Sequence, residues 1–127
     1  MPELPEVETI RRQLAPAIEG RRLERIEVLD SRWCDPAPPE AVADALDGRL
    51  IERLGRRGKY LVASFEDDVH LVMHLRMTGN LLLVPTAKDD PGRPHLRVRF
   101  ALSGGRRGAG AKQLDRLLFV DVRRFGT

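Results

Sequence analysis

The 127-residue sequence has a single cysteine, Cys34, and it has no long apolar run. One cysteine cannot form an internal disulfide or a cysteine-based zinc site, so we expect a fold that needs neither. We assign no metal-binding residue in this chain. No uninterrupted apolar stretch approaches the roughly 18 residues of a membrane-spanning helix. The first six residues include two prolines and two acidic residues, which do not form a signal peptide. These absences predict a cytoplasmic protein without membrane contact.

Lysine is also scarce: among the 22 lysine and arginine residues, only Lys59, Lys88 and Lys112 are lysines. Arginine therefore dominates the charge, which is +3 with an isoelectric point of about 9.6. A basic balance permits an anionic partner such as nucleic acid but does not identify one. A soluble basic protein from an arginine-rich proteome fits the composition equally well. Apolar residues make up 42% of the chain, enough for one folded domain with a core.

Two segments have the pattern of helices. Residues 5–18 are predicted to form one amphipathic helix, and Gly20 can end it. Its apolar side chains recur at helical spacing on one face: Val7, Ile10, Leu14 and Ile18. Residues 40–47 are predicted to form a second, short helix that stops at Gly48.

The rest of the chain has the alternation and the turn residues of strands. The candidate strands are residues 23–28, 49–54, 60–65, 69–75, 80–84, 96–102 and 117–122. Residues 103–112 are predicted to form a glycine-rich hairpin loop and not a phosphate cradle, because they lack the lysine-and-hydroxyl ending of that motif. The pattern predicts a mostly β, single domain over residues 1–127: an antiparallel eight-stranded β-sandwich or flattened barrel with an N-terminal helix and a second short helix.

The N-terminus has the chemistry of a nucleophile. Removal of Met1 would leave Pro2 with a free secondary amine, whose pKa near ~8 keeps a useful fraction neutral and nucleophilic. Attack of this amine on a sugar C1′ can give an iminium, and the neighbouring Glu3 can move protons there. Taken alone, these residues also fit the ordinary start of a chain.

Four strings along the sequence carry a family resemblance. They are MPELPEVET at residues 1–9, RGKYL at 57–61, HLRMTG at 74–79 and DVRRFG at 121–126. In this order and at about these spacings, they resemble the formamidopyrimidine-DNA glycosylase family. The related endonuclease VIII proteins typically begin with a PEGPE-like string, so Leu4 favours the purine-directed branch.

The resemblance implies roles for individual residues. Pro2 would be the Schiff-base nucleophile, Glu3 the catalytic acid and base, and Lys59 an active-site cation near the phosphate of the damaged nucleotide. A lysine ammonium can give up a proton whereas an arginine cannot, which fits a role for Lys59 in elimination.

The resemblance also implies a DNA-binding set. His74 and His95 would contact phosphates, and Met77, Arg123 and Phe125 would fill the hole that base extrusion leaves in the duplex. Without the resemblance, the two histidines would be interpreted as structural, and Met77 and Phe125 as core residues.

The activity implied is excision of oxidised or ring-opened purines (8-oxoguanine, formamidopyrimidines) from damaged double-stranded DNA, followed by β,δ-elimination at the abasic sugar. No cofactor is expected in this chain. The helix–two-turns–helix domain and the zinc finger of the family, with its one structural zinc, are expected to lie outside residues 1–127. The chain alone is therefore expected to be an inactive monomer, nucleoid-associated in the cytoplasm. Two alternatives stay open: a non-catalytic, arginine-rich DNA-binding β-module, and a pyrimidine-directed relative of endonuclease VIII.

Overall fold

The structure is a computed structural model that describes residues 4–75, 78–89, 93–103 and 114–122. Five of the predicted site residues lie outside these ranges: Pro2, Glu3, Met77, Arg123 and Phe125. Lys59, His74 and His95 lie inside them. The glycine-rich segment at 103–112 also lies outside the described residues, apart from Ser103.

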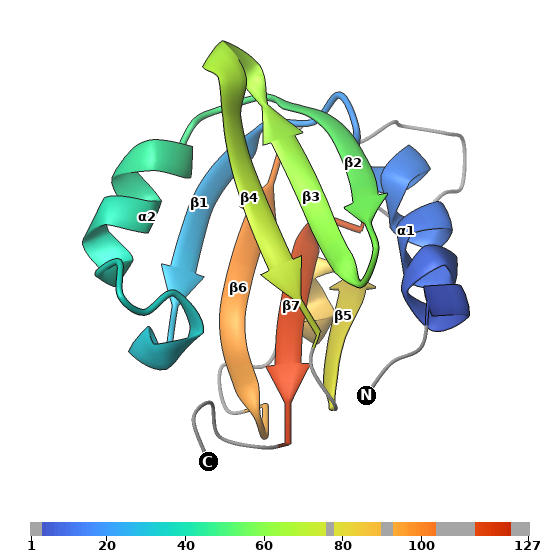
Figure 1. The fold of residues 1–127 in the computed structure, drawn as a ribbon. Coiled ribbons are helices and arrows are strands. Elements are labelled where there is room, and N and C mark those ends of the chain that lie inside the picture. The colour runs from blue at the N-terminus through green and yellow to red at the C-terminus, as the bar shows by residue number, and fades with distance from the viewer. Residues whose placement is uncertain (1–3, 76–77, 90–92, 104–113, 123–127) are drawn as a thin grey trace.

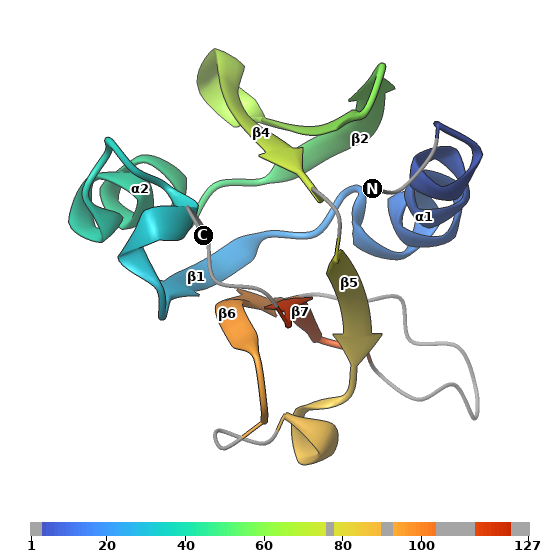
Figure 2. The same ribbon diagram turned by 60° about the horizontal axis from the view of Figure 1, so that its bottom comes forward.

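Two antiparallel sheets stack face to face to form a sandwich (Figures 1 and 2). The larger sheet has the strand order β1-β6-β7-β5, and the smaller has the order β2-β3-β4. The strand bounds are β1 Leu23–Val28, β2 Ile51–Arg57, β3 Tyr60–Phe65, β4 Val69–His74, β5 Gly79–Val84, β6 Leu96–Leu102 and β7 Arg116–Asp121.

Helices flank the sandwich on two opposite sides, as Figure 2 shows. Helix α1 (Leu4–Ile18) lies beside β2, and helix α2 (Pro39–Leu46) lies beside β1. Short 3-10 turns connect other elements: η1 (Ser31–Trp33), η2 (Glu66–Asp68) and η3 (Thr86–Lys88). No helix among the described residues is long and apolar enough to cross a membrane.

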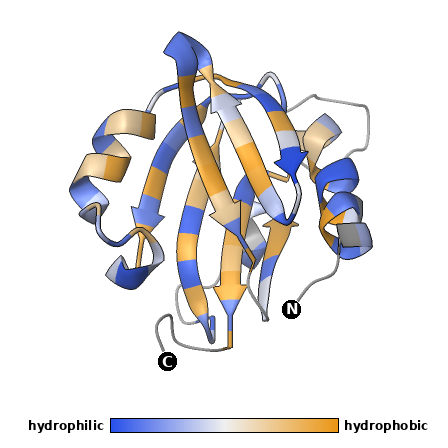
Figure 3. Cartoon of the chain, in the orientation of Figure 1, coloured by the Kyte–Doolittle hydropathy of each residue, from blue (hydrophilic) through white to orange (hydrophobic). Residues whose placement is uncertain are grey.

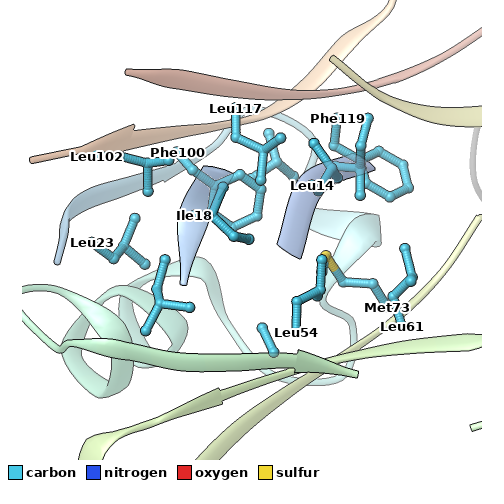
Figure 4. Packing of buried hydrophobic residues seen from close by; sticks show 14 of the residues in the cluster. Leu14, Ile18, Leu23, Leu54, Leu61, Met73, Phe100, Leu102, Leu117 and Phe119 are labelled. Carbon is cyan, nitrogen blue, oxygen red and sulfur yellow. The ribbon is translucent and has the colours of Figure 1, made fainter. Parts of the chain in front are cut away.

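The core fills the space between the sheets, and α1 contributes to it (Figure 4). Along β6, buried and half-buried residues alternate strictly. Hydrophobic and hydrophilic residues also alternate along this strand, as its colours in Figure 3 show. Trp33 closes one flank with edge-to-face contacts, at centroid distances of 6.3 Å to Phe100 and 5.8 Å to Phe119. The residues labelled in Figure 4 come from both sheets and α1: Leu14, Ile18, Leu23, Leu54, Leu61, Met73, Phe100, Leu102, Leu117 and Phe119.

The structure confirms the mostly β sandwich and its two helices. The described residues form seven strands, and their two sheets do not close into a barrel. One boundary differs markedly, because β2 continues to Arg57 where the pattern predicted an end at residue 54. Gly55, Arg56 and Arg57 have no apolar alternation, but each pairs with a residue of β3 in the hairpin.

The two ends of the sandwich differ in what they carry. At one end, the lower one in Figure 1, lie the β2–β3 turn, the end of β4, the start of β5 and the end of β7. We call this the site end, because Lys59, His74 and His95 all belong to it. The opposite end, here called the far end, carries η2, the end of β6 and the start of β7.

Candidate functional site

Lys59 lies in the two-residue turn that joins β2 to β3. Arg57 pairs with Tyr60 across this turn, so that Gly58 and Lys59 form its central positions. Gly58 has a φ of 56°, a left-handed conformation that glycine adopts without steric cost, and glycine first in the loop is typical of a type II′ turn. The hairpin therefore presents Lys59, half-buried, at a fixed place on the site end.

A hydrogen-bonded chain ties this turn to helix α1. Glu8 Oε1 accepts from Arg56 Nε at 2.9 Å, and Arg56 Nη1 donates to the backbone oxygen of Gly58 at 3.0 Å. The other oxygen of Glu8 accepts from Arg11 at 2.7 Å and from Arg12 at 2.8 Å. Hydrogen bonds from Arg11, then Arg56 and Arg12, hold the pKa of Glu8 far below its usual value. This carboxylate thus connects the early turns of α1 to the turn that carries Lys59.

His74 ends β4 and pairs directly with Tyr60, the residue after Lys59. Their rings meet edge to face at 5.0 Å, with His74 half-buried and Tyr60 exposed. Arg57 is exposed on the neighbouring strand, in register with Tyr60. The structure therefore brings Lys59 and His74 to one corner of the small sheet, where a lysine, an arginine and two aromatic rings suit a phosphate and its sugar.

The connection from β4 to β5 passes through a tight turn. The backbone nitrogen of Gly79 donates to the oxygen of Leu75 at 2.8 Å, and a Cβ on Gly79 would lie 2.3 Å from that oxygen. Any other residue at this position must shift the backbone. This bond holds Leu75 and Gly79 together. The predicted void-filling Met77 lies between them in the sequence and outside the described residues.

His95 lies at the start of β6, on the larger sheet, and is exposed. Its φ of 64° is a left-handed conformation that is uncommon outside glycine, although histidine adopts it more often than most residues. Its backbone oxygen accepts from the nitrogen of Asp121 at 3.0 Å, a bond that holds this turn against the end of β7. His70, interpreted from the sequence as structural, binds Ser64 and Asp68 through its two ring nitrogens, at 3.0 Å and 2.9 Å.

Three polar residues of the site end were not identified from the sequence: Glu8, Thr78 and Asp121. Each lies inside or beside one of the four motif strings, and that position was the only signal available. Their contacts join segments 43 to 48 residues apart, which no local pattern reveals. No group of histidine, cysteine and carboxylate side chains within the described ranges could hold a metal ion.

Comparison with known proteins assigns the chain to a family. A family model described as the formamidopyrimidine-DNA glycosylase N-terminal domain matches residues 1–127. Curated proteins named formamidopyrimidine-DNA glycosylase from Heliobacterium modesticaldum and Moorella thermoacetica are each 44% identical to it. The alignments cover 100% and 99% of this chain but only 43% and 42% of those proteins, so the chain spans less than half the length of these relatives.

Solved structures agree with the sequence comparison. The Lactococcus lactis enzyme in complex with DNA containing a formamidopyrimidine lesion of deoxyguanosine superposes with a TM-score of 0.80 at 35% identity, covering 97% of this chain and 42% of that one. A MutM protein in complex with DNA containing carbocyclic 8-oxo-G superposes with a TM-score of 0.81 at 36% identity, covering 98% and 42%.

Proposed function

This chain belongs to the formamidopyrimidine-DNA glycosylase family as an N-terminal domain, and we propose that it is the catalytic domain of a DNA-repair enzyme that excises oxidised or ring-opened purines. One observation carries the proposal. Two relatives that share its fold at a TM-score of 0.80 or more have been solved in complex with DNA that contains a ring-opened or an 8-oxidised guanine. The expected partner of this chain is likewise damaged double-stranded DNA.

The proposed reaction begins at the N-terminus. The nitrogen of Pro2 bonds to C1′ of the damaged nucleotide, the bond from C1′ to the base breaks, and the base leaves with a proton. Opening of the sugar ring gives an iminium at C1′, with Glu3 supplying and removing protons. The iminium acidifies the C2′ proton, whose loss expels the 3′ phosphate, and a second elimination expels the 5′ phosphate.

The described residues support this chemistry by holding the DNA backbone. Lys59 has a charge that can bind the phosphate of the damaged nucleotide and a proton that can be given to a leaving oxygen. His74, next to it across the β3–β4 pair, and His95, on the other sheet, would contact neighbouring phosphates. Phosphate contacts of this kind fix the register of the duplex and leave recognition of the lesion to other groups.

A pyrimidine-directed activity is the second candidate. The Lactococcus lactis relative has also been solved in complex with DNA containing an oxidized pyrimidine. Family membership therefore leaves the preferred lesion to be measured on this protein.

The experiment compares nicking of duplexes that carry 8-oxoguanine, a formamidopyrimidine lesion, an oxidised pyrimidine or no lesion, with the domain in a chain of its relatives' full length. We expect fastest cleavage of the two purine lesions, with phosphate left at both sides of the gap. Preference for the pyrimidine lesion would favour the second candidate. Binding without cleavage of any lesion would instead identify a DNA-binding module.

A further inference from the structure

Asp121 is one of two charged side chains that the described part of the chain buries, with an exposed fraction of 2%. A buried carboxylate is costly unless hydrogen bonds and charges compensate it. Because Asp121 lies at the end of β7, where polar residues usually turn toward water, its burial at the site end calls for an explanation.

The contacts of Asp121 join separate segments of the site end. Its carboxylate oxygen Oδ1 accepts a hydrogen bond from the hydroxyl of Thr78, 43 residues earlier. Its backbone nitrogen donates to the oxygen of His95 at 3.0 Å, and its backbone oxygen accepts from Arg97 Nε at 3.1 Å. It also pairs with Gly79 in the ladder between β5 and β7.

These contacts lie next to the predicted DNA-binding residues. Thr78 directly follows Met77, His95 is itself a predicted phosphate contact, and Asp121 precedes Arg123 and Phe125 by two and four residues. One side chain and its backbone thus connect the chain segments that carry four of the five predicted contacts. The fifth, His74, belongs to the other sheet.

We propose that Asp121 is a positioning residue: its bond to Thr78 aligns the start of β5 with the His95 turn and the end of β7, so that these segments meet an extruded nucleotide together. This inference rests on the proposed function. Segments aligned in advance do not have to be ordered when DNA binds, which strengthens binding to the distorted duplex. Binding to an undamaged duplex depends mainly on distributed phosphate contacts and needs no such alignment.

The test uses the domain in a chain of its relatives' full length and measures two dissociation constants. The ratio of interest is the constant for an undamaged duplex divided by the constant for the same duplex with a tetrahydrofuran abasic-site analogue. Thr78→Val removes the hydroxyl with little change of volume. We expect it to lower the ratio about tenfold, as loss of a hydrogen bond to a buried charged group should. Asp121→Ala should lower the ratio at least as much. Asp121→Asn keeps an accepting Oδ1, so its ratio should stay close to that of the unmodified protein.

Thr86→Val is the matched control. Thr86 donates to both oxygens of Asp115, at 2.7 Å and 2.8 Å, beyond the other end of the same β5–β7 pair. This variant should leave the ratio unchanged. If Thr78→Val and Asp121→Ala lower the melting temperature but not the ratio, Asp121 is only structural and the proposal is wrong. If the unmodified protein itself does not prefer the abasic duplex, the proposed function fails instead.

Discussion

The described residues bury two charged side chains, and these lie at opposite ends of the sandwich: Asp121 at the site end and Arg21 at the far end. Arg21 is 5% exposed and donates to three backbone oxygens, those of Ser103 at 3.0 Å, Leu114 at 2.6 Å and Ala17 at 3.4 Å. Ser103 and Leu114 flank the glycine-rich segment between β6 and β7. Burial lowers the pKa of Arg21, although the nearby Asp115 opposes the shift.

The two residues hold the chain in different ways. The hydrogen bonds of Arg21 within the described residues go to backbone oxygens, so they depend on the path of the chain there. Asp121 binds the side chain of Thr78, which belongs to one of the four motif strings. We therefore expect Arg21 to stabilise the fold, whereas the proposed role of Asp121 is to align the DNA-binding segments. Each of the following predictions tests whether stability and activity separate between the two ends in this way.

The largest effect on activity is expected at the site end, from Glu3→Gln. Loss of the carboxyl proton donor should slow base excision by about 10²–10⁴-fold and leave the melting temperature unchanged. Single-turnover excision of 8-oxoguanine, with thermal unfolding in parallel, measures both. Normal excision by this variant would show that proton transfer is done elsewhere.

The largest effect on stability is expected at the far end, from Arg21→Met. The change leaves the oxygens of Ser103 and Leu114 without this donor, which should lower the free energy of unfolding by about 1–3 kcal/mol. Excision by the folded protein should stay normal. Urea denaturation and single-turnover kinetics check the two halves, and a selective loss of excision with unchanged stability would reverse the comparison.

Glu8→Gln should have an intermediate effect, confined to the site end. It weakens the connection from α1 through Arg56 to the Lys59 turn, so strand cleavage should slow several-fold, more than base excision does. Arg12→Gln is the control, since Arg12 also binds Glu8 but is exposed and, within the described residues, makes no hydrogen bond to the turn. Equal slowing by both variants would show that the charge of Glu8, and not its link to Arg56, is what matters.

The lowered pKa of Glu8 also fixes the sign of its pH dependence. A carboxyl whose pKa is lower in the folded protein contributes stability above its ordinary value of 4.5 and loses it as the pH falls through the folded value. Between neutral pH and about pH 5, the excision rate should therefore depend on pH in the same way in the unmodified protein and in Glu8→Gln. A step in this range that disappears in the variant would mean that Glu8 titrates there.

The smallest effect is expected from Arg49→Ala at the far end. Arg49 pairs with Asp67, an exposed residue of η2, at 2.6 Å. Exposed ion pairs contribute only about 0–1 kcal/mol, so melting temperature and excision should both stay close to those of the unmodified protein. A marked loss of excision would place part of the functional surface at the far end.

The sequence predicted elements better than the contacts between them. Alternation along residues 96–102 and the apolar spacing of 5–18 are local properties, and β6 and α1 follow them closely. The end of β2 was missed because Gly55–Arg57 owe their strand conformation to pairing with β3 and not to their own pattern. Lys59, His74 and His95 were identified only through the family resemblance.

The site residues that sequence reasoning missed share one property. Glu8 and Asp121 act through partners distant in sequence, Arg56 and Thr78, and a carboxylate at a helix start or a strand end is usually solvated. Only the fold brings each of them against its partner. Five predicted site residues lie outside the described ranges, and their roles stay predictions: Pro2, Glu3, Met77, Arg123 and Phe125.

Borohydride trapping tests the central claim most directly, because it asks which atom of this domain reacts with DNA. The domain, in a chain of its relatives' full length, is incubated with an 8-oxoguanine duplex and reduced with borohydride. The product is digested, and the adduct is mapped by mass spectrometry. The account predicts one adduct on the nitrogen of Pro2, with Met1 removed, and no such adduct on an undamaged duplex. An adduct on Lys59, or cleavage of the lesion duplex with no trapped adduct, would contradict it.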